Sequence, residues 1–179
     1  MAKIIIVGDG PGGLSAALFL SKKGQHDVTV YGKDETAMHY AMLKNYLGLP
    51  DTSGVDFQDD ARKQLERYGV PVTDVTVTAV RAVDGGVEVD AGDDTSQADY
   101  LILSEGQKAP LAESLGLEMT GEGIAVDRWG RTAVERVYAV GRCVRQGRSQ
   151  AIISAGDGAA AALDIMSEIE GKDIQDWDS

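Results

Sequence analysis

Glycines at a fixed spacing are the first residues in this sequence that indicate chemistry. A Gly-x-Gly-x-x-Gly pattern follows an apolar run at residues 3–7 and precedes apolar residues at helical spacing. In such a strand–turn–helix unit, the first glycine permits a tight turn, the second lets the backbone approach a diphosphate, and the third lets the helix pack on the strand. We predict a dinucleotide-binding loop; the alternative is a glycine turn that only packs a helix on a sheet. The residues expected at the diphosphate are Gly8, Gly10, Pro11, Gly12 and Gly13.

Three residues near this loop complicate the prediction. Asp9 places a carboxylate inside the loop, where it adds no attraction for a diphosphate. An acidic residue usually follows the second strand and binds the ribose hydroxyls, but Gly32 stands at that place. Lys33 comes next, and it either pairs with a 2′-phosphate, which would indicate NADP, or is a solvated surface lysine.

Further motifs lie far along the chain from the glycine loop. They are Asn45-Tyr-Leu-Gly48, Val137-Tyr-Ala-Val-Gly-Arg142 and Gln150-Ala151. Together with the glycine loop, they resemble the thioredoxin-reductase-like, FAD-dependent pyridine nucleotide-disulfide oxidoreductases. In that family the Asn motif faces the flavin and the Gln-Ala pair begins the last helix beneath it. The resemblance covers residues 1 to about 106 and about 108 to 170, and it implies FAD as the cofactor.

The resemblance also implies a fold and a domain plan. We expect an α/β, Rossmann-like FAD-binding fold, a three-layer ββα sandwich with a parallel central sheet and a small antiparallel β-meander. Residues 1–172 would form a single FAD-binding domain, and residues 173–179 an acidic tail. The family's NADPH domain, which carries a Cys-x-x-Cys motif, has no counterpart at about 106–108.

Periodicity and turn residues predict the individual elements. Strands are expected at residues 3–7, 27–31, 75–83, 86–91, 100–103, 124–127 and 137–140, with a hairpin turn at Asp84-Gly-Gly. Helices are expected at residues 12–23, 55–68, 112–117 and 150–170.

The resemblance extends the candidate cofactor site beyond the glycine loop. Arg142 stands where the family carries an Asp that accepts a hydrogen bond from a ribityl hydroxyl, and an arginine has donors only. Arg142 could instead neutralise the diphosphate, with Arg145 and Arg148 either adding to an anion site or remaining solvated. The additional candidate residues are Gly32, Lys33, Asn45, Gly106, Gly141, Arg142, Gln150 and Ala151.

Composition excludes several functions. The net charge is -12, and 19 of the 29 acidic residues are Asp, so the chain should repel nucleic acids and anionic membranes. We expect a cytoplasmic protein, either from a high-salt cytoplasm, which screens a dense carboxylate surface, or an ordinary acidic one. The single cysteine, Cys143, cannot form a dithiol couple, and His26 and His39 give no metal-site pattern.

The sequence therefore favours an FAD-binding electron-transfer protein. Thioredoxin reductase activity is not expected, and no acid–base pair emerges, so no catalytic residue is named. Electrons would come from a free nicotinamide or from a donor or acceptor protein docked on the flavin face. A surface bared by a missing domain favours a homodimer or hetero-complex. The alternatives are a non-enzymatic dinucleotide-binding subunit and an NADP-dependent enzyme that uses Lys33.

Overall fold

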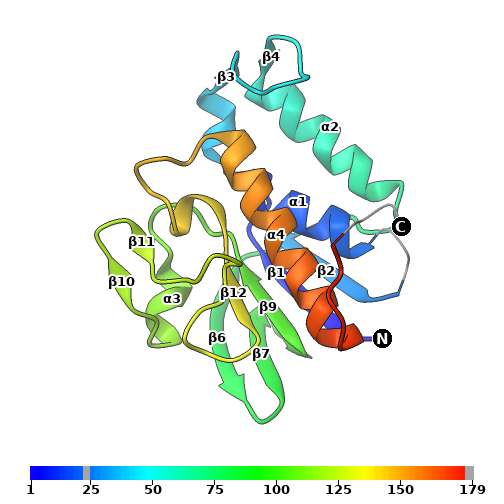
Figure 1. The fold of residues 1–179 in the computed structure, drawn as a ribbon, viewed down its shortest axis with the longest axis vertical. Helices are drawn as coiled ribbons and strands as arrows, with labels where there is room; N and C mark the ends of the chain where they lie inside the picture. The colour runs from blue at the N-terminus through cyan, green and yellow to red at the C-terminus, as the bar shows by residue number, and fades with distance from the viewer. Residues whose placement is uncertain (22–24, 176–179) are drawn as a thin grey trace.

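A five-stranded parallel sheet forms the centre of the computed structural model, which describes residues 1–21 and 25–175 (Figure 1). The strands lie in the order β12-β9-β1-β2-β5. Their bounds are β1 (Lys3–Val7), β2 (Asp27–Gly32), β5 (Val72–Asp74), β9 (Tyr100–Leu103) and β12 (Val137–Ala139). Strand β1 pairs with β2 on one side and with β9 on the other. After β1 the chain adds β2 and β5 on one side of it, and then β9 and β12 on the other side, so the strand order reverses between β1 and β9. Open α/β sheets bind ligands at such a point, beyond the carboxyl ends of the strands.

The two faces of this sheet are covered by different layers. Ile4 and Ile6 pack in one core with α1 (Pro11–Ser21) and α4 (Ala151–Glu170), and α2 (Gly54–Glu66) lies beside α1. Ile5 and Val7 pack in a second core. That core contains the antiparallel meander β6 (Val77–Val83), β7 (Gly86–Ala91) and β8 (Asp94–Ala98), together with α3 (Pro110–Ser114). The predicted α/β three-layer ββα sandwich with a small β-meander is confirmed.

Short elements complete the chain. They are η1 (Ala37–Tyr40), β3 (Met42–Leu43), β4 (Thr52–Ser53), β10 (Met119–Thr120), β11 (Gly123–Ile124) and η2 (Gly141–Cys143). Within residues 1–21 and 25–175, no helix is both long enough and apolar enough to cross a membrane.

The predicted elements and the observed ones differ at a few places. Strands β5 and β8 were not predicted, because both are short, and β8 is rich in polar residues. The helix predicted at 112–117 lies at Pro110–Ser114, and the strand predicted at 124–127 is shortened to Gly123–Ile124. The hairpin turn between β6 and β7 is confirmed. The last two residues of the first predicted helix (22–23), and most of the predicted acidic tail (176–179), lie outside the described residues.

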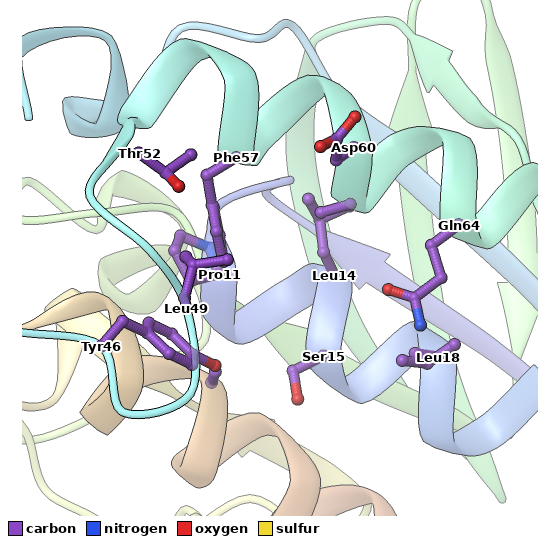
Figure 2. A pocket seen from close by; sticks show the side chains of 12 residues that line it. Pro11, Leu14, Ser15, Leu18, Tyr46, Leu49, Thr52, Phe57, Asp60 and Gln64 are labelled. Carbon is purple, nitrogen blue, oxygen red and sulfur yellow. The ribbon is translucent and has the colours of Figure 1, made fainter. Parts of the chain in front are cut away.

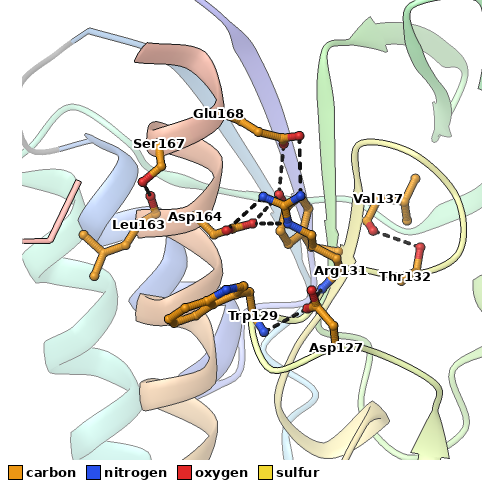
Figure 3. A network of polar contacts seen from close by, with 10 residues as sticks. Asp127, Trp129, Arg131, Thr132, Val137, Leu163, Asp164, Ser167 and Glu168 are labelled. Carbon is orange, nitrogen blue, oxygen red and sulfur yellow. Dashed lines mark hydrogen bonds and ion pairs between the residues drawn. The ribbon is translucent and has the colours of Figure 1, made fainter. Parts of the chain in front are cut away.

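A polar network, the α4 clamp (Arg131, Tyr138, Asp164 and Glu168), fastens β12 and the loop before it to α4 (Figure 3). Arg131 donates from Nε to Asp164 Oδ2 at 2.6 Å and from Nη2 to Oδ1 at 3.0 Å, while Tyr138 Oη donates to Oδ2 at 2.7 Å. Burial and the Asp164 carboxylate raise the pKa of the Tyr138 hydroxyl, so it stays protonated as a donor.

Candidate dinucleotide-binding site

The glycine loop (residues 8–13) connects β1 to α1 at the carboxyl edge of the sheet. Gly8 has φ +102°, and a Cβ atom there would overlap the carbonyl of Ser104. A Cβ at Gly13 would overlap the carbonyl of Gly8, whereas a Cβ at Gly10 would meet nothing within 4 Å. The protein's own packing therefore requires glycine at positions 8 and 13 but not at 10. Position 10 faces open space, as expected if a ligand approaches the backbone there.

Helix α1 begins next to this open space, and the first turn of α4 packs against Gly12, two residues beyond Gly10. Helix α1 starts at Pro11 with no acidic residue in its first turn, and α4 starts at Ala151 with no side-chain cap from Gln150. The first N–H groups of a helix have no partner within the helix and carry a partial positive charge. Between the two helix starts lies Gly141, where a Cβ would be 3.9 Å from the Cα of Gly12 and 3.3 Å from the Cβ of Ser154. The site thus offers backbone donors suited to an anion.

The Asn motif and the Gln-Ala pair are brought together by the fold. Asn45 Nδ2 donates to Gln150 Oε1 at 2.9 Å, although the two residues are 105 positions apart. This bond ties the loop before β4 to Gln150, the residue that directly precedes α4, and the first residue of α4, Ala151, is buried. Two predicted site segments therefore form one wall next to the glycine loop.

Arg142, in η2, and Arg145, two residues after η2, have different partners. Arg142 is exposed and donates from Nη2 to Gln107 Oε1 at 3.1 Å, just beyond Gly106. Arg145 pairs with Asp157 of α4 at 3.0 Å, so its charge is matched within the chain. Lys33 is exposed in the turn after β2 and forms no side-chain hydrogen bond or ion pair with a described residue.

Asp9 does not face the open space above Gly10. It is 4% exposed, and its carboxylate pairs with Arg62 of α2 and accepts a hydrogen bond from the Asp34 backbone N at 3.1 Å. A Cβ at Gly32 would lie 2.6 Å from Asp9 Oδ1, so glycine at position 32 makes room for the Asp9 side chain. The carboxylate that seemed to oppose a diphosphate is thus turned aside and paired with a cation.

Two further ionisable groups, Glu105 and Cys143, lie near the carboxyl end of β9. Glu105 Oε2 accepts a hydrogen bond from the Leu111 backbone N at 3.1 Å, and burial raises the pKa of its carboxyl group. Cys143 is fully buried, and burial with the nearby Glu105 charge raises the pKa of its thiol to about 12. The thiol is therefore protonated at neutral pH and is not a nucleophile.

A cavity of about 310 Å³ lies between α1, α2 and the loop after Asn45 (Figure 2). Its walls include Leu14 and Leu18 of α1, Phe57 of α2 and Tyr46 of the loop. Of the predicted site residues, Pro11 lines it. The cavity lies on the helix side of the glycine loop, beside the predicted site.

Sequence reasoning missed the residues that hold Asp9 in place. Gln58 and Arg62 lie one turn apart on α2, and Gln58 Nε2 donates to the Asp9 carbonyl while Arg62 pairs with its carboxylate. Gln58 is 1% exposed, and the polar position in an otherwise amphipathic helix gave no sign of its partner. No group of three or more metal-ligating side chains occurs among residues 1–21 and 25–175.

Comparison with known proteins identifies similar sequences. A sequence model of the family described as pyridine nucleotide-disulphide oxidoreductase matches residues 49–159. A thioredoxin reductase from Neurospora crassa is 28% identical over 179 residues, covering 93% of this chain and 49% of that protein. A ferredoxin–NADP reductase from Saccharopolyspora erythraea is 29% identical over 167 residues, covering 88% of this chain and 45% of that protein. The chain spans about half the length of the curated relatives it matches.

A solved structure shares the fold at low sequence identity. A ferredoxin-flavin thioredoxin reductase from Clostridium acetobutylicum superposes with a TM-score of 0.83 at 17% identity, covering 96% of this chain and 99% of that one. At this identity the likeness establishes the fold alone.

Proposed function

Because this chain belongs to the pyridine nucleotide-disulphide oxidoreductase family, whose cofactor is FAD, we propose that it is a flavin-domain oxidoreductase that transfers electrons to or from a partner protein. It would do so as a single FAD-binding domain, residues 1–172, without the NADPH domain that the family resemblance places at about 106–108. Thioredoxin reductase activity would then be absent, because the chain holds one cysteine and no dithiol.

The observation that carries the proposal is the open space at Gly10. The neighbouring glycines, Gly8 and Gly13, are needed to avoid overlap with the protein's own carbonyl groups, but Gly10 is not. Helix α1 begins at the next residue, the first turn of α4 and the start of η2 pack against Gly12, and Asp9 is paired with Arg62. The residues present therefore fit a diphosphate bridging two halves of a dinucleotide.

Bound FAD would supply the redox chemistry, and the chain would bind and orient it. The backbone at Gly10, Gly12 and Gly13 would donate to the diphosphate. Arg142, an exposed residue of η2, would add a positive charge near the diphosphate. The hydrogen-bonded pair Asn45–Gln150 and the start of α4 would form the wall of the flavin pocket.

Exposed apolar side chains beside this wall support the docking of a partner protein. Tyr40 is 95% exposed and Leu47 is 90% exposed, on the segment that flanks Asn45. Ile152 and Ile153, in the first turn of α4, are also exposed. Two similar proteins carry ferredoxin in their names, so a ferredoxin is the partner to test first.

The test is the visible absorbance spectrum of the protein purified in high salt, with the released cofactor identified after denaturation. We expect flavin bands, FAD released at one per chain, and bleaching by reduced ferredoxin but not by NADPH alone. A colourless protein that fails to bind added FAD would contradict the proposal and would support the non-enzymatic alternative. The Arg142→Asp variant is the companion measurement, and we expect it to weaken FAD retention.

A further inference from the structure

The Asp9 side chain occupies an unusual place for a glycine-loop residue. Its backbone lies between Gly8 and Gly10, but its carboxyl group lies over Gly32 at the end of β2. A Cβ at Gly32 would be 2.5 Å from the Asp9 Cβ and 2.6 Å from its Oδ1. The Asp9 side chain therefore fills the space that a side chain at position 32 would enter.

The end of β2 is the position from which dinucleotide-binding folds present an acidic residue to the ribose hydroxyls. This chain has Gly32 there, and the exposed Lys33 that follows has no acceptor group. Asp34 follows Lys33, but its Oδ1 lies 3.1 Å from His39 Nε2, and the glycine loop brings a second carboxylate, Asp9, over Gly32.

The carboxylate is held in a fixed orientation. Its Oδ2 accepts from both Arg62 and the Asp34 backbone N, and the Asp9 carbonyl accepts from the buried Gln58. Among the described residues, no hydrogen bond is made to Oδ1. One oxygen is thus used for positioning, while the other keeps its capacity to accept.

The Asp9–Arg62 pair leaves more acceptor capacity than the pair in the α4 clamp. Both oxygens of Asp164 accept hydrogen bonds from Arg131, whereas only Oδ2 of Asp9 accepts one from a described residue. Arg62 also cancels the charge that would oppose the diphosphate at the adjacent Gly10.

We propose that Asp9 is the acidic residue of this chain that binds the ribose, supplied by the glycine loop and oriented by Arg62; this inference rests on the proposed function. Its Oδ1 accepts a hydrogen bond from a hydroxyl of the adenosine ribose. Arg62 is a positioning residue, since it acts through Asp9.

The experiment compares the dissociation constants of ADP and 2′,3′-dideoxy-ADP by calorimetry, after FAD binding to the apoprotein has been measured. For the unmodified chain we expect dideoxy-ADP to bind roughly 10-fold more weakly, the effect of one hydrogen bond to a charged acceptor. In Asp9→Ala the two ligands should bind equally. The ratio of the two dissociation constants is informative because a purely structural role of Asp9 would weaken the binding of both ligands alike.

Two variants keep the test interpretable. Asp9→Asn has the same shape, so it should fold even if Asp9→Ala does not, and it should reduce the ratio. Asp90→Ala removes a half-buried partner of Arg81 on the meander, and it should leave the ratio of the two dissociation constants unchanged. Thermal melting without ligand checks that each variant is folded.

The outcomes separate the two proposals. An unmodified chain that binds FAD but does not distinguish ADP from dideoxy-ADP overturns the role of Asp9 and leaves the proposed function standing. A ratio that persists in Asp9→Ala also overturns it. A chain that binds neither FAD nor ADP overturns both.

Discussion

Two arginine–aspartate pairs join helices to the central sheet, one at the carboxyl edge of the strands and one toward the C-terminal end of α4. In the α4 clamp, Asp164 uses both oxygens for Arg131, and Tyr138 donates to one of them. In the loop pair, Asp9 uses one oxygen for Arg62 and the Asp34 backbone. The residue types are the same, but the partners differ in how completely they satisfy the carboxylate.

The difference in how fully the two carboxylates are bonded indicates different roles: stability for Asp164 and ligand binding for Asp9. The Asp164 carboxylate is 10% exposed and satisfied, so it can hold β12 to the helix but has little left to offer a ligand. The Asp9 pair lies next to a backbone segment that faces open space at Gly10. A carboxylate oxygen without a hydrogen-bond partner can accept one from a ligand, whereas a carboxylate whose two oxygens are both bonded within the protein serves to hold two elements together.

The largest effect is expected from breaking the clamp. Asp164→Ala removes the hydrogen-bonded partner of Arg131, which keeps only the looser ion pair with Glu168 at 3.8 Å among the described residues, and it leaves the buried Tyr138 hydroxyl with Glu168, 3.1 Å away. We expect the free energy of unfolding in urea to fall by about 2 kcal/mol, because a buried polar group loses a partner. FAD affinity should change less than twofold.

Asp94→Ala, an exposed aspartate of β8, is the control and should change stability by less than about 0.5 kcal/mol. An Asp164→Ala protein that keeps its stability but loses FAD would reverse the comparison.

The converse change is Gly10→Ala in the glycine loop. Since an added Cβ meets nothing within 4 Å, we expect the free energy of unfolding to change by less than about 0.5 kcal/mol. FAD affinity should fall at least tenfold, or about 1.4 kcal/mol, because the methyl group enters the space of the diphosphate. Calorimetric titration of the apoprotein measures this, and equal affinity would show that the open space is not the binding space.

Varying the salt concentration tests whether local ion pairs or the net charge of the whole chain has the larger effect on stability. With a net charge of -12, repulsion between carboxylates should be screened as salt rises. We expect the free energy of unfolding to increase by about 1 kcal/mol between roughly 0.1 and 1 M KCl. A decrease would mean that ion pairs such as the clamp outweigh the overall repulsion.

The smallest effect is expected at Glu105, whose pKa is raised by burial. A raised folded-state pKa gives stability below the unfolded pKa, and this is lost as pH rises through the folded value. Glu105→Gln keeps an acceptor for Leu111 and removes the buried charge. The variant should therefore be more stable at pH 7, by less than about 1 kcal/mol, and the gain should vanish near pH 4. Urea unfolding at both pH values checks this, and a pH-independent difference would contradict it.

Much of the fold could be predicted because its signals are local. The Ile run of β1, the glycine loop and the start of α1 are contiguous, so their apolar spacing and turn residues suffice. Strand β5 was missed because three residues carry almost no periodicity, and its existence depends on pairing with β2. The Asn45–Gln150 contact was not predicted: the family resemblance assigned each residue separately to the flavin site, and no local rule links residues 105 positions apart.

The sequence by itself determined that a glycine loop joins a buried strand to a helix, that the chain's single cysteine cannot form a dithiol, and that its composition is strongly acidic. These properties depend on neighbouring residues or on composition. Only the tertiary structure decided which way Asp9 points. Its direction is set by Arg62, 53 positions away on α2, and by the space that Gly32 leaves at the end of β2. A carboxylate is attractive or repulsive to a ligand according to its partners and position, and folding supplies both.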